Sequence, residues 1–329
     1  MLINKRIMVT GAGGFIGSHL VEKLIESGAK VKALVHYNSR NDIGLLNLIN
    51  EELKQKIDII LCDLNDYNAV LDVAKNVEII FHLGALIAIP YSYIHPRQVV
   101  MTNINSTLNV MMAARECPNV KIIIHTSSSE VYGSAQYVPM DEKHPLDCQS
   151  PYAASKVGAD KIAESFYKSF NIPVSIIRPF NCYGPRQSAR AVIPTIISQA
   201  LNKKEIHIGS TFPTRDYTYC TDTVDAMIAM SNCEKAIGEV VNAGSGFEIS
   251  IAEIIDKVFE IIGYELPIVQ DNKRIRPNKS EVDRLFCDNT KAKKLMGWEN
   301  RISFDNGLKM TIKWVKENID FYDTNRYII

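Results

Sequence analysis

Short, nearly continuous apolar runs alternate with amphipathic segments along the first 180 residues of the chain. Such runs are typical of strands buried on both faces of a parallel sheet, and the segments between them carry apolar residues at helical spacing. The pattern predicts strands at Arg6–Thr10, Lys30–His36, Ile57–Cys62, Glu78–His82, Lys121–Ser127 and Pro173–Pro179, and helices at Phe15–Ser27, Ala69–Asn76, Gln98–Glu116 and Tyr152–Phe170. This order predicts an α/β fold on a doubly wound parallel sheet, a Rossmann fold.

The pattern becomes less regular after Pro179. Helical periodicity returns at Ala191–Leu201, Thr221–Cys233, Ile251–Ile262 and Phe304–Lys316, with short strands at Glu239–Asn242 and Leu266–Gln270. We predict that residues 1–180 form the sheet domain and residues 181–329 a smaller, interleaved α/β lobe, with residues 221–243 packing back on the sheet. No repeat or low-complexity linker separates the two parts.

Composition narrows the classes of partner. The 329 residues hold 37 basic and 37 acidic side chains, so no basic excess indicates binding to nucleic acid or to a membrane surface. The seven cysteines are odd in number and include no C-x-x-C pair. No apolar run approaches the ~20 residues of a membrane helix, and no signal-peptide pattern precedes the first strand. We therefore expect a cytoplasmic protein with reduced thiols and without a metal site.

A glycine-rich turn follows the first predicted strand. Gly11, Gly14 and Gly17 form a G-x-x-G-x-x-G pattern, and the helix begins inside it at Phe15 and Ile16. Glycine permits positive φ, close approach of the backbone to a pyrophosphate and tight packing of the helix on the sheet, while the helix N-terminus offers N–H donors. A glycine triplet alone can be a structural turn, but one that opens a βαβ unit predicts a dinucleotide site.

The choice of dinucleotide depends on the end of the second strand. An acidic residue there would hold the ribose 2′-hydroxyl of NAD. This chain has His36, Ser39 and Arg40 and no carboxylate among residues 36–40, so a 2′-phosphate and hence NADP are favoured, with NAD possible. The alternative for Arg40 is a solvated loop side chain. Asp63, followed by Leu64, closes the third strand and is placed to accept from the adenine amino group.

Tyr152 and Lys156 form a Y-x-x-x-K pair on one face of a predicted helix. A free tyrosine has a pKa of ~10, and a neighbouring lysine cation and an oxidised nicotinamide both stabilise the phenolate, which makes it a base for a sugar hydroxyl. The pair alone is often a surface feature. Here a polar run, Ser127 to Glu130, ends the fifth strand at the carboxyl edge of the sheet, where ligands of such folds bind. The conjunction predicts a catalytic site.

Over essentially its whole length the sequence resembles the extended short-chain dehydrogenase/reductase family, the NAD-dependent epimerase/dehydratase group. The matching features are the Gly11 turn, Asp63-Leu64, His82-Leu83-Gly84-Ala85, Asn103 with Ser106-Thr107, Ser127 to Gly133, Tyr152 with Lys156, Arg178 to Pro185, Arg215-Asp216-Tyr217, Asn242-Ala243-Gly244 and Arg276-Pro277. By this resemblance residues 1–180 bind the dinucleotide and residues 181–329 bind a nucleotide-sugar substrate.

The resemblance also implies roles for individual residues. Tyr152 is the base for the C4 hydroxyl, Lys156 binds the nicotinamide ribose and Ser128 supports the substrate oxygen. Leu83, Ala85 and Asn103 join the cofactor site. On the substrate side the resemblance implies that Asn181, Arg215 and Arg276 contact the diphosphate, Glu281 lies near a ribose hydroxyl and Val192 lines the base pocket. For the two arginines the alternative is surface ion pairing.

Glu130 decides which reaction the resemblance favours. Dehydratases, epimerases and decarboxylases of the family all begin with oxidation at C4. An acidic residue at the Glu130 position is typical of 4,6-dehydratases and decarboxylases, whereas simple epimerases carry a small or apolar residue. Ser129 replaces the aspartate of deoxythymidine-diphosphate-glucose dehydratases and matches guanosine-diphosphate-mannose dehydratases. We expect a 4,6-dehydratase in which Glu130 removes H5 and, with Ser129 beside it, also serves the loss of water from C6.

Three further segments resemble dehydratases of nonulosonic-acid pathways of the legionaminic or pseudaminic type. They are Ala88 to Tyr93, Ser39 to Gly44 and Arg276 to Glu281. The resemblance implies a UDP- or GDP-linked N-acetylglucosamine as substrate. A C4 epimerase, a uronic-acid decarboxylase and a non-catalytic nucleotide-sugar sensor stay open.

The resemblance also implies a homodimer that pairs helices 98–116 and 152–170. Both helices carry apolar residues that we place beyond a single core-facing stripe, namely Val110, Met111, Met112, Ile162 and Phe166. The alternative for these residues is burial under the second lobe.

Overall fold

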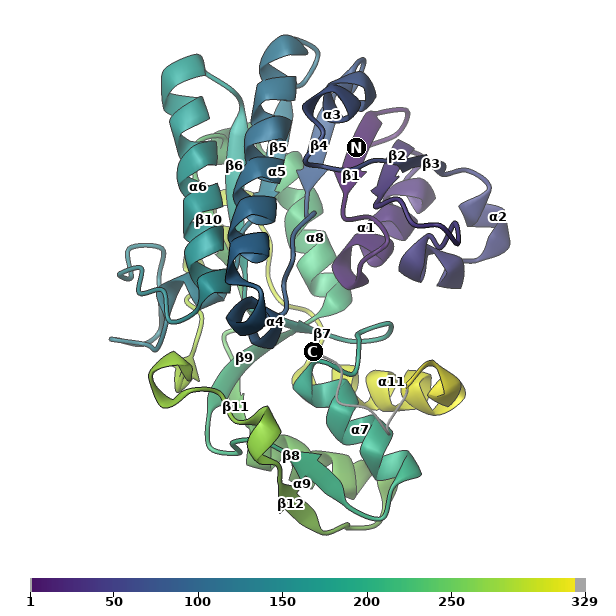
Figure 1. The fold of residues 1–329 in the computed structure, drawn as a ribbon, viewed down its shortest axis with the longest axis vertical. Helices are drawn as coiled ribbons and strands as arrows, with labels where there is room; N and C mark the ends of the chain where they lie inside the picture. Colours follow the sequence, from purple (N-terminus) through teal and green to yellow (C-terminus); the bar gives the residue numbers. More distant parts are fainter. Residues whose placement is uncertain (1, 323–329) are drawn as a thin grey trace.

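The computed structural model describes residues 2–322 and is built around a parallel sheet of seven strands (Figure 1). The strand order is β10-β6-β5-β4-β1-β2-β3. Its members are β1 (Arg6–Thr10), β2 (Lys30–Val35), β3 (Asp58–Leu61), β4 (Ile79–His82), β5 (Ile122–Thr126), β6 (Val174–Pro179) and β10 (Val240–Ala243). The first six agree with the predicted strands to within one residue at each end. The order reverses between β1 and β4, which makes this the switch point of the sheet.

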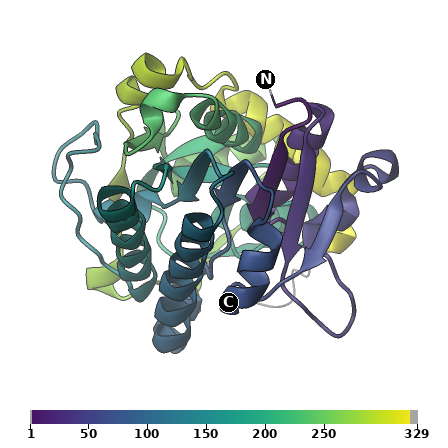
Figure 2. The same cartoon turned by 90° about the horizontal axis from the view of Figure 1, so that it is seen from above.

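Helices cover both faces of the sheet, which confirms the doubly wound fold (Figure 2). One face carries α3 (Tyr67–Ala74), α5 (Pro96–Glu116) and α6 (Pro151–Phe170), and the other carries α1 (Phe15–Glu26), α8 (Cys220–Ser231) and α10 (Thr290–Met296). Successive residues of β1 divide between the two cores: Met8 packs with the first set, and Ile7 and Val9 with the second. Apolar residues on both faces explain the continuous runs in the sequence.

A second lobe follows β6. In it α7 (Val192–Asn202), α9 (Ile251–Ile262) and α11 (Phe304–Glu317) enclose a core of their own. The lobe's strands are β7 (Asn181–Tyr183), β8 (Ile206–Ile208), β9 (Thr214–Tyr219), β11 (Glu248–Ser250), β12 (Ile268–Gln270) and β13 (Arg284–Leu285). β9 pairs with β7, β11 and β13, and β8 pairs with β12. The chain returns to the large sheet through α8 and β10, which pairs with β6.

The apolar residues that we placed beyond the core stripe of α5 and α6 are mostly inside the chain's own core, so that expectation is wrong. Val110, Met111 and Phe166 are buried between these helices and the sheet. Met112 and Ile162 are partly buried and pack against the same core. α5 and α6 lie side by side (Figure 1) and contact each other as well as the sheet, so each helix needs a broader apolar face than a single stripe.

A fully buried carboxylate joins α6 to two strands of the sheet. Asp160 on α6 accepts hydrogen bonds from the Ser127 hydroxyl just beyond β5 (2.8 Å) and from Nη2 of Arg178 on β6 (3.1 Å). It also lies 3.2 Å from Nε2 of His125 on β5. Burial alone would raise the pKa of Asp160, but the hydrogen bond and charge of His125 and the charge of Arg178 outweigh it and hold the pKa below its ordinary value. Asp160 is therefore an ionised anchor.

The network continues toward the edge of the sheet. Arg178 donates to the Tyr132 hydroxyl at 3.0 Å, and its guanidinium lies over the Tyr132 ring at 4.9 Å. Tyr132 in turn donates to the side-chain oxygen of Asn242 on β10 at 2.7 Å. The segment after β5, which carries Tyr132, is thus fixed to β6 and β10.

Replacing Asp160 with alanine should destabilise the protein by about 3–5 kcal/mol, because Arg178 stays buried without its carboxylate. The free energy of unfolding in urea measures the loss. Asp72→Ala is the matched control, since that carboxylate is 71% exposed and pairs with Lys75 on the surface; it should cost less than about 1 kcal/mol. Equal losses in the two variants would show that the buried network does not stabilise the fold.

Candidate active site

The glycine turn after β1 has no room for side chains at its first and last glycines. Gly11 has a φ of +69°, and a Cβ there would lie 2.9 Å from the backbone nitrogen of Gly84. A Cβ on Gly17 would overlap the Gly11 carbonyl oxygen. α1 begins at Phe15, and its N-cap, Gly14, supplies no capping side chain. The first-turn N–H groups, those of Phe15 and Ile16 included, are therefore available to an anion at the switch point, and the turn fits a dinucleotide pyrophosphate.

The loop after β2 is tied to this turn. Leu45 donates its N–H to the Gly13 carbonyl at 2.9 Å. The Asn38 side chain accepts from the backbone N–H groups of Arg40 (3.1 Å) and Asp42 (3.0 Å) and so fixes the bend. The side chains of His36, Ser39 and Arg40 are all exposed, and Arg40 makes no ion pair with any residue between 2 and 322.

Two of the predicted cofactor residues are occupied by contacts within the chain. Both amide hydrogens of Asn103 are used, by the Leu86 carbonyl at 3.0 Å and the Ser155 hydroxyl at 2.8 Å. Its side-chain oxygen accepts from the Leu86 N–H at 2.7 Å. Asn103 thus links the segment after β4 to α6. One oxygen of Asp63 accepts from the backbone and side chain of Asn65, but this carboxylate is exposed.

The remaining predicted cofactor residues line the strand ends on either side of the switch point. Leu83 and Gly84, directly after β4, donate their N–H groups to the Thr10 hydroxyl at 3.1 and 2.9 Å. Leu83, Ala85 and Leu64 are half-buried. The ends of β1 and β4 are thereby held together.

Tyr152 and Lys156 are both buried at the start of α6, close to the end of β5. The Ser128 hydroxyl hydrogen-bonds the Tyr152 hydroxyl, and Lys156 Nζ donates to the Thr126 carbonyl at 2.6 Å. Burial raises the pKa of Tyr152 to about 12, against the effect of the Ser128 hydrogen bond. Burial lowers the pKa of Lys156 to about 8. Tyr152 thus requires a positive charge nearby before it can act as a base near neutral pH.

Glu130 lies in a cluster of two carboxylates and two guanidinium groups. Its Oε2 is 3.8 Å from Nη1 of Arg276, and the same nitrogen is 3.8 Å from Oε1 of Glu281. Nη2 of Arg215 on β9 lies 3.4 Å from Oε1 of Glu281. The structure thus brings together residues from three distant segments that the sequence could only name separately.

Two tyrosines belong to this cluster although the sequence assigned them no role. The Tyr217 hydroxyl is buried and has no hydrogen-bond partner among the described residues. It interacts electrostatically with Arg215, Arg276 and Glu130. The hydroxyl of Tyr93, on α4 (Ile89–Ile94), lies 2.7 Å from the Ser280 hydroxyl. Tyr93 also interacts electrostatically with Arg276 and Glu130. Strand alternation is the signal that would have identified Tyr217, since it shares a face of β9 with Arg215.

Three further predicted residues take no part in the ion pairs of this cluster. Asn181 begins β7 and is the register partner of Tyr217. Val192 begins α7 and packs against the core of the second lobe. Ser129 stands beside Glu130 and is almost fully buried.

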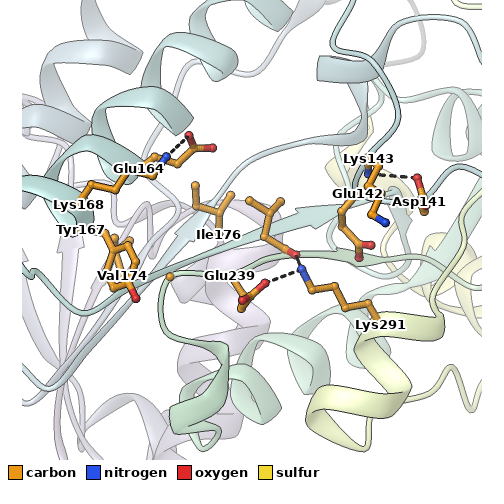
Figure 3. A pocket seen from close by; sticks show the side chains of 12 residues that line it. Asp141, Glu142, Lys143, Glu164, Tyr167, Lys168, Val174, Ile176, Glu239 and Lys291 are labelled. Carbon is orange, nitrogen blue, oxygen red and sulfur yellow. Dashed lines mark hydrogen bonds and ion pairs between the residues drawn. The ribbon is translucent and has the colours of Figure 1, made fainter.

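A separate hollow of about 480 Å³ lies at the β10 edge of the sheet and contains none of the predicted site residues (Figure 3). Lys291 enters it, pairs with Glu239 at 2.7 Å and donates to the Val240 carbonyl at 2.6 Å. The Glu142 carboxylate accepts from the Asn242 N–H on the same strand at 2.8 Å. These side chains form hydrogen bonds with backbone groups of the edge strand β10 that no neighbouring strand pairs, so they have a structural role.

Other kinds of site are absent from the described part of the chain. No group of three or more His, Cys, Asp or Glu side chains is arranged to hold a metal among residues 2–322. No helix in that range is long and apolar enough to span a membrane. None of the seven cysteines is paired.

The parallel sheet, the glycine turn at its switch point and the Tyr152–Lys156 pair define an extended short-chain dehydrogenase/reductase. The chain belongs to the GDP-mannose 4,6 dehydratase family, whose model matches residues 8–311. It is 32% identical over 321 residues to UDP-glucuronate 4-epimerase of Thermodesulfobacterium geofontis, covering 95% of this chain and 97% of that one. It is 30% identical over 322 residues to human dTDP-D-glucose 4,6-dehydratase, covering 95% of this chain and 91% of the relative.

Solved structures agree with this assignment. UDP-glucuronic acid 4-epimerase of Bacillus cereus, in complex with UDP-glucuronic acid and NAD, superposes with a TM-score of 0.86 at 27% identity, covering 95% of this chain and 99% of that one. Relatives in sequence also include a UDP-N-acetyl-α-D-glucosaminuronate decarboxylase. The family therefore contains dehydratases, epimerases and decarboxylases of nucleotide sugars, and this chain is an enzyme of that group.

Proposed function

We propose that the protein is a nucleotide-sugar 4,6-dehydratase acting on a UDP- or GDP-linked N-acetylglucosamine. The observation that carries the proposal is the position of Glu130. Its carboxylate is near enough to Tyr152 for its charge to raise the pKa of that phenol, and it faces both arginines. Elimination of water needs a second acid–base group beside the one that serves oxidation at C4, and Glu130 is that group.

The steps follow from the placement of the side chains. Tyr152 takes the proton of the C4 hydroxyl, with Ser128 holding the same oxygen and Lys156 favouring the phenolate. The chemistry that a bound nicotinamide supplies is hydride removal from C4 and its return to C6. The 4-keto group acidifies H5, which Glu130 removes. Glu130 then passes this proton to the departing C6 hydroxyl, which leaves as water, because Ser129 has no acidic group to offer. Return of the hydride to C6 leaves an enolate whose C5 takes up a proton from solvent, and Tyr152 releases the O4 proton to solvent, so the reaction balances as the loss of one water.

The second lobe binds the nucleotide sugar in this proposal. Arg215 and Arg276 hold the diphosphate through charge-assisted hydrogen bonds, with Asn181 beside them. The unpartnered Tyr217 hydroxyl donates to the same ligand. Glu281 contacts a ribose hydroxyl and Val192 lines the base pocket. The UDP-sugar in the Bacillus cereus epimerase supports a nucleotide sugar as ligand, and the resemblance of Ala88 to Tyr93 supports N-acetylglucosamine.

A C4 epimerase is the second candidate, favoured by the 32% identity to UDP-glucuronate 4-epimerase. The product mass separates the two functions, because an epimerase returns an isomer of equal mass. A decarboxylase would instead release carbon dioxide. Mass spectrometry of products from a panel of UDP-, GDP- and CDP-sugars tests all three.

The cofactor of the proposal is a nicotinamide dinucleotide. In this proposal the glycine turn binds the pyrophosphate of the dinucleotide. Asp63 and Leu64 contact its adenine, and Leu83 and Ala85 lie along the half that carries the nicotinamide. NAD in solved neighbours supports NAD, whereas the exposed Arg40 and Ser39 favour NADP. A cytoplasmic location stays a prediction from the sequence.

Glu130→Gln should lower the rate of dehydration by ~10²–10⁴-fold, because the amide keeps the size of the side chain but can neither take nor give the proton. Oxidation at C4 should survive, so enzyme mixed with its sugar should accumulate the absorbance of reduced nicotinamide. Tyr152→Phe should abolish both signals. A product lighter by one water, formed by Glu130→Gln at close to the wild-type rate, would show that Glu130 is not the base.

Protein stripped of cofactor should bind NADP more tightly than NAD, and Arg40→Ala should remove the difference. Titration calorimetry with both dinucleotides measures it. Arg97→Ala is the control: it removes an exposed arginine that lies on α5, away from the loop of Arg40, and should change neither affinity. A preference for NAD that Arg40→Ala leaves unaltered would assign NAD instead.

We expect a homodimer through the outer surfaces of α5 and α6, where Met101, Tyr167 and Phe170 are exposed. Light scattering at micromolar concentration should give twice the 36.9 kDa mass of the chain. Met101→Glu should weaken the dimer, whereas Phe212→Glu, at an exposed position of the second lobe, should not. A monomeric wild type would remove the proposed interface.

A further inference from the structure

We propose that Arg276 is the counter-ion of Glu130 in the free enzyme and exchanges this carboxylate for the substrate diphosphate, which makes Glu130 a stronger base in the complex. The inference rests on the proposed function, because it concerns the carboxylate assigned there to proton removal at C5. It gives Arg276 a second task beside that of holding the diphosphate.

The geometry shows a guanidinium that is shared and loosely held. Nη1 of Arg276 is 3.8 Å from Glu130 and 3.8 Å from Glu281, too far for a hydrogen bond to either, and this nitrogen has no hydrogen-bond partner among the described residues. Arg178 is a contrast within the same chain, since its Nη2 lies 3.1 Å from Asp160 and the pair is almost fully buried. Arg178 is fixed to one carboxylate, whereas Arg276 is positioned to change partners.

Charge balance gives the exchange its direction. The charged and titratable groups that face Glu130 are Arg276, Arg215, Tyr93, Tyr152 and Tyr217. With Glu281 the cluster holds two cations and two anions. The diphosphate of a nucleotide sugar adds two negative charges and offers the arginines stronger, bidentate partners. Glu130 then has less positive charge beside it, so its charged form is disfavoured and its proton affinity rises.

The test compares the pH profiles of kcat and kcat/KM for dehydration, using the nucleotide sugar from the panel that the wild type dehydrates fastest. The profile of kcat/KM reports groups of the free enzyme, and that of kcat reports groups of the complex. Burial raises the pKa of Tyr152 to about 12 and lowers that of Lys156 to about 8, so both groups titrate on the alkaline side. The acid limb of kcat/KM should lie ~1 pH unit below that of kcat.

Two variants separate this role from a structural one. Arg276→Gln should shift the acid limb of the kcat/KM profile to a pH ~1 unit higher. It should shift the acid limb of the kcat profile much less, because in the complex Arg276 already faces the diphosphate. Glu281→Gln should shift the acid limb of the kcat/KM profile to lower pH, since Arg276 then pairs with Glu130 alone. Asp216, whose pKa burial raises to about 6, bonds Ser245 and Gly246 instead of the cluster, and a limb due to it should respond to neither change.

The outcomes are distinct. If the acid limbs of both profiles shift to higher pH by the same amount in Arg276→Gln, Arg276 stays the counter-ion of Glu130 in the complex. If neither limb shifts, Arg276 is not its counter-ion at all. Either result overturns the inference but leaves the proposed dehydratase function standing. Absence of any product lighter by one water in the wild type overturns the proposed function, and this inference with it.

Discussion

The ionised Asp160 carboxylate is the contact on which the geometry of the active site depends. It receives hydrogen bonds from the ends of β5 and β6 and is itself part of α6, one turn beyond Lys156. The first two turns of α6 supply Tyr152 and Lys156, and the segment after β5 supplies Ser128 and Glu130. The distance between the two halves of the proposed catalytic site is therefore set by a buried, charged contact, whose position is more narrowly defined than that of apolar packing.

The second lobe completes the site from the other side. Arg215, Arg276 and Glu281 reach Glu130 from β9 and from the segment after β12, so the proposed acid–base group and the two arginines proposed to bind the substrate form one electrostatic unit. Interleaving of the chain supports this arrangement, because α8 and β10 return from the second lobe to the large sheet.

Relatives on the same scaffold carry out several reactions. In the proposed function Tyr152 with Lys156 serves the oxidation at C4, and the residue at position 130 selects the step that follows. Burial raises the pKa of the Tyr152 phenol to about 12, so in the proposed function it acts as a base only with the positive charges of Lys156 and of the bound cofactor beside it. In the same proposal a carboxylate at position 130 extends that chemistry to C5 and C6 without any change of fold, which is why fold alone cannot name the reaction.

The sequence by itself determined the large sheet, the glycine turn and the identity of most residues in the site. Continuous apolar runs predicted β1 to β6 to within one residue, because burial on both faces leaves a local signature. β7 and β9 left none: β7 has only three residues, and β9 (Thr214–Tyr219) opens with three polar residues instead of an apolar run. Only the tertiary structure showed that Val110, Met111 and Phe166 belong to the core and that both amide hydrogens of Asn103 are occupied. It alone revealed Asp160 as an anchor and brought Glu130, 146 positions before Arg276 in the sequence, to that guanidinium. Periodicity is a local property that records which face of an element is buried, whereas these contacts join residues that only the packing of separate elements brings together.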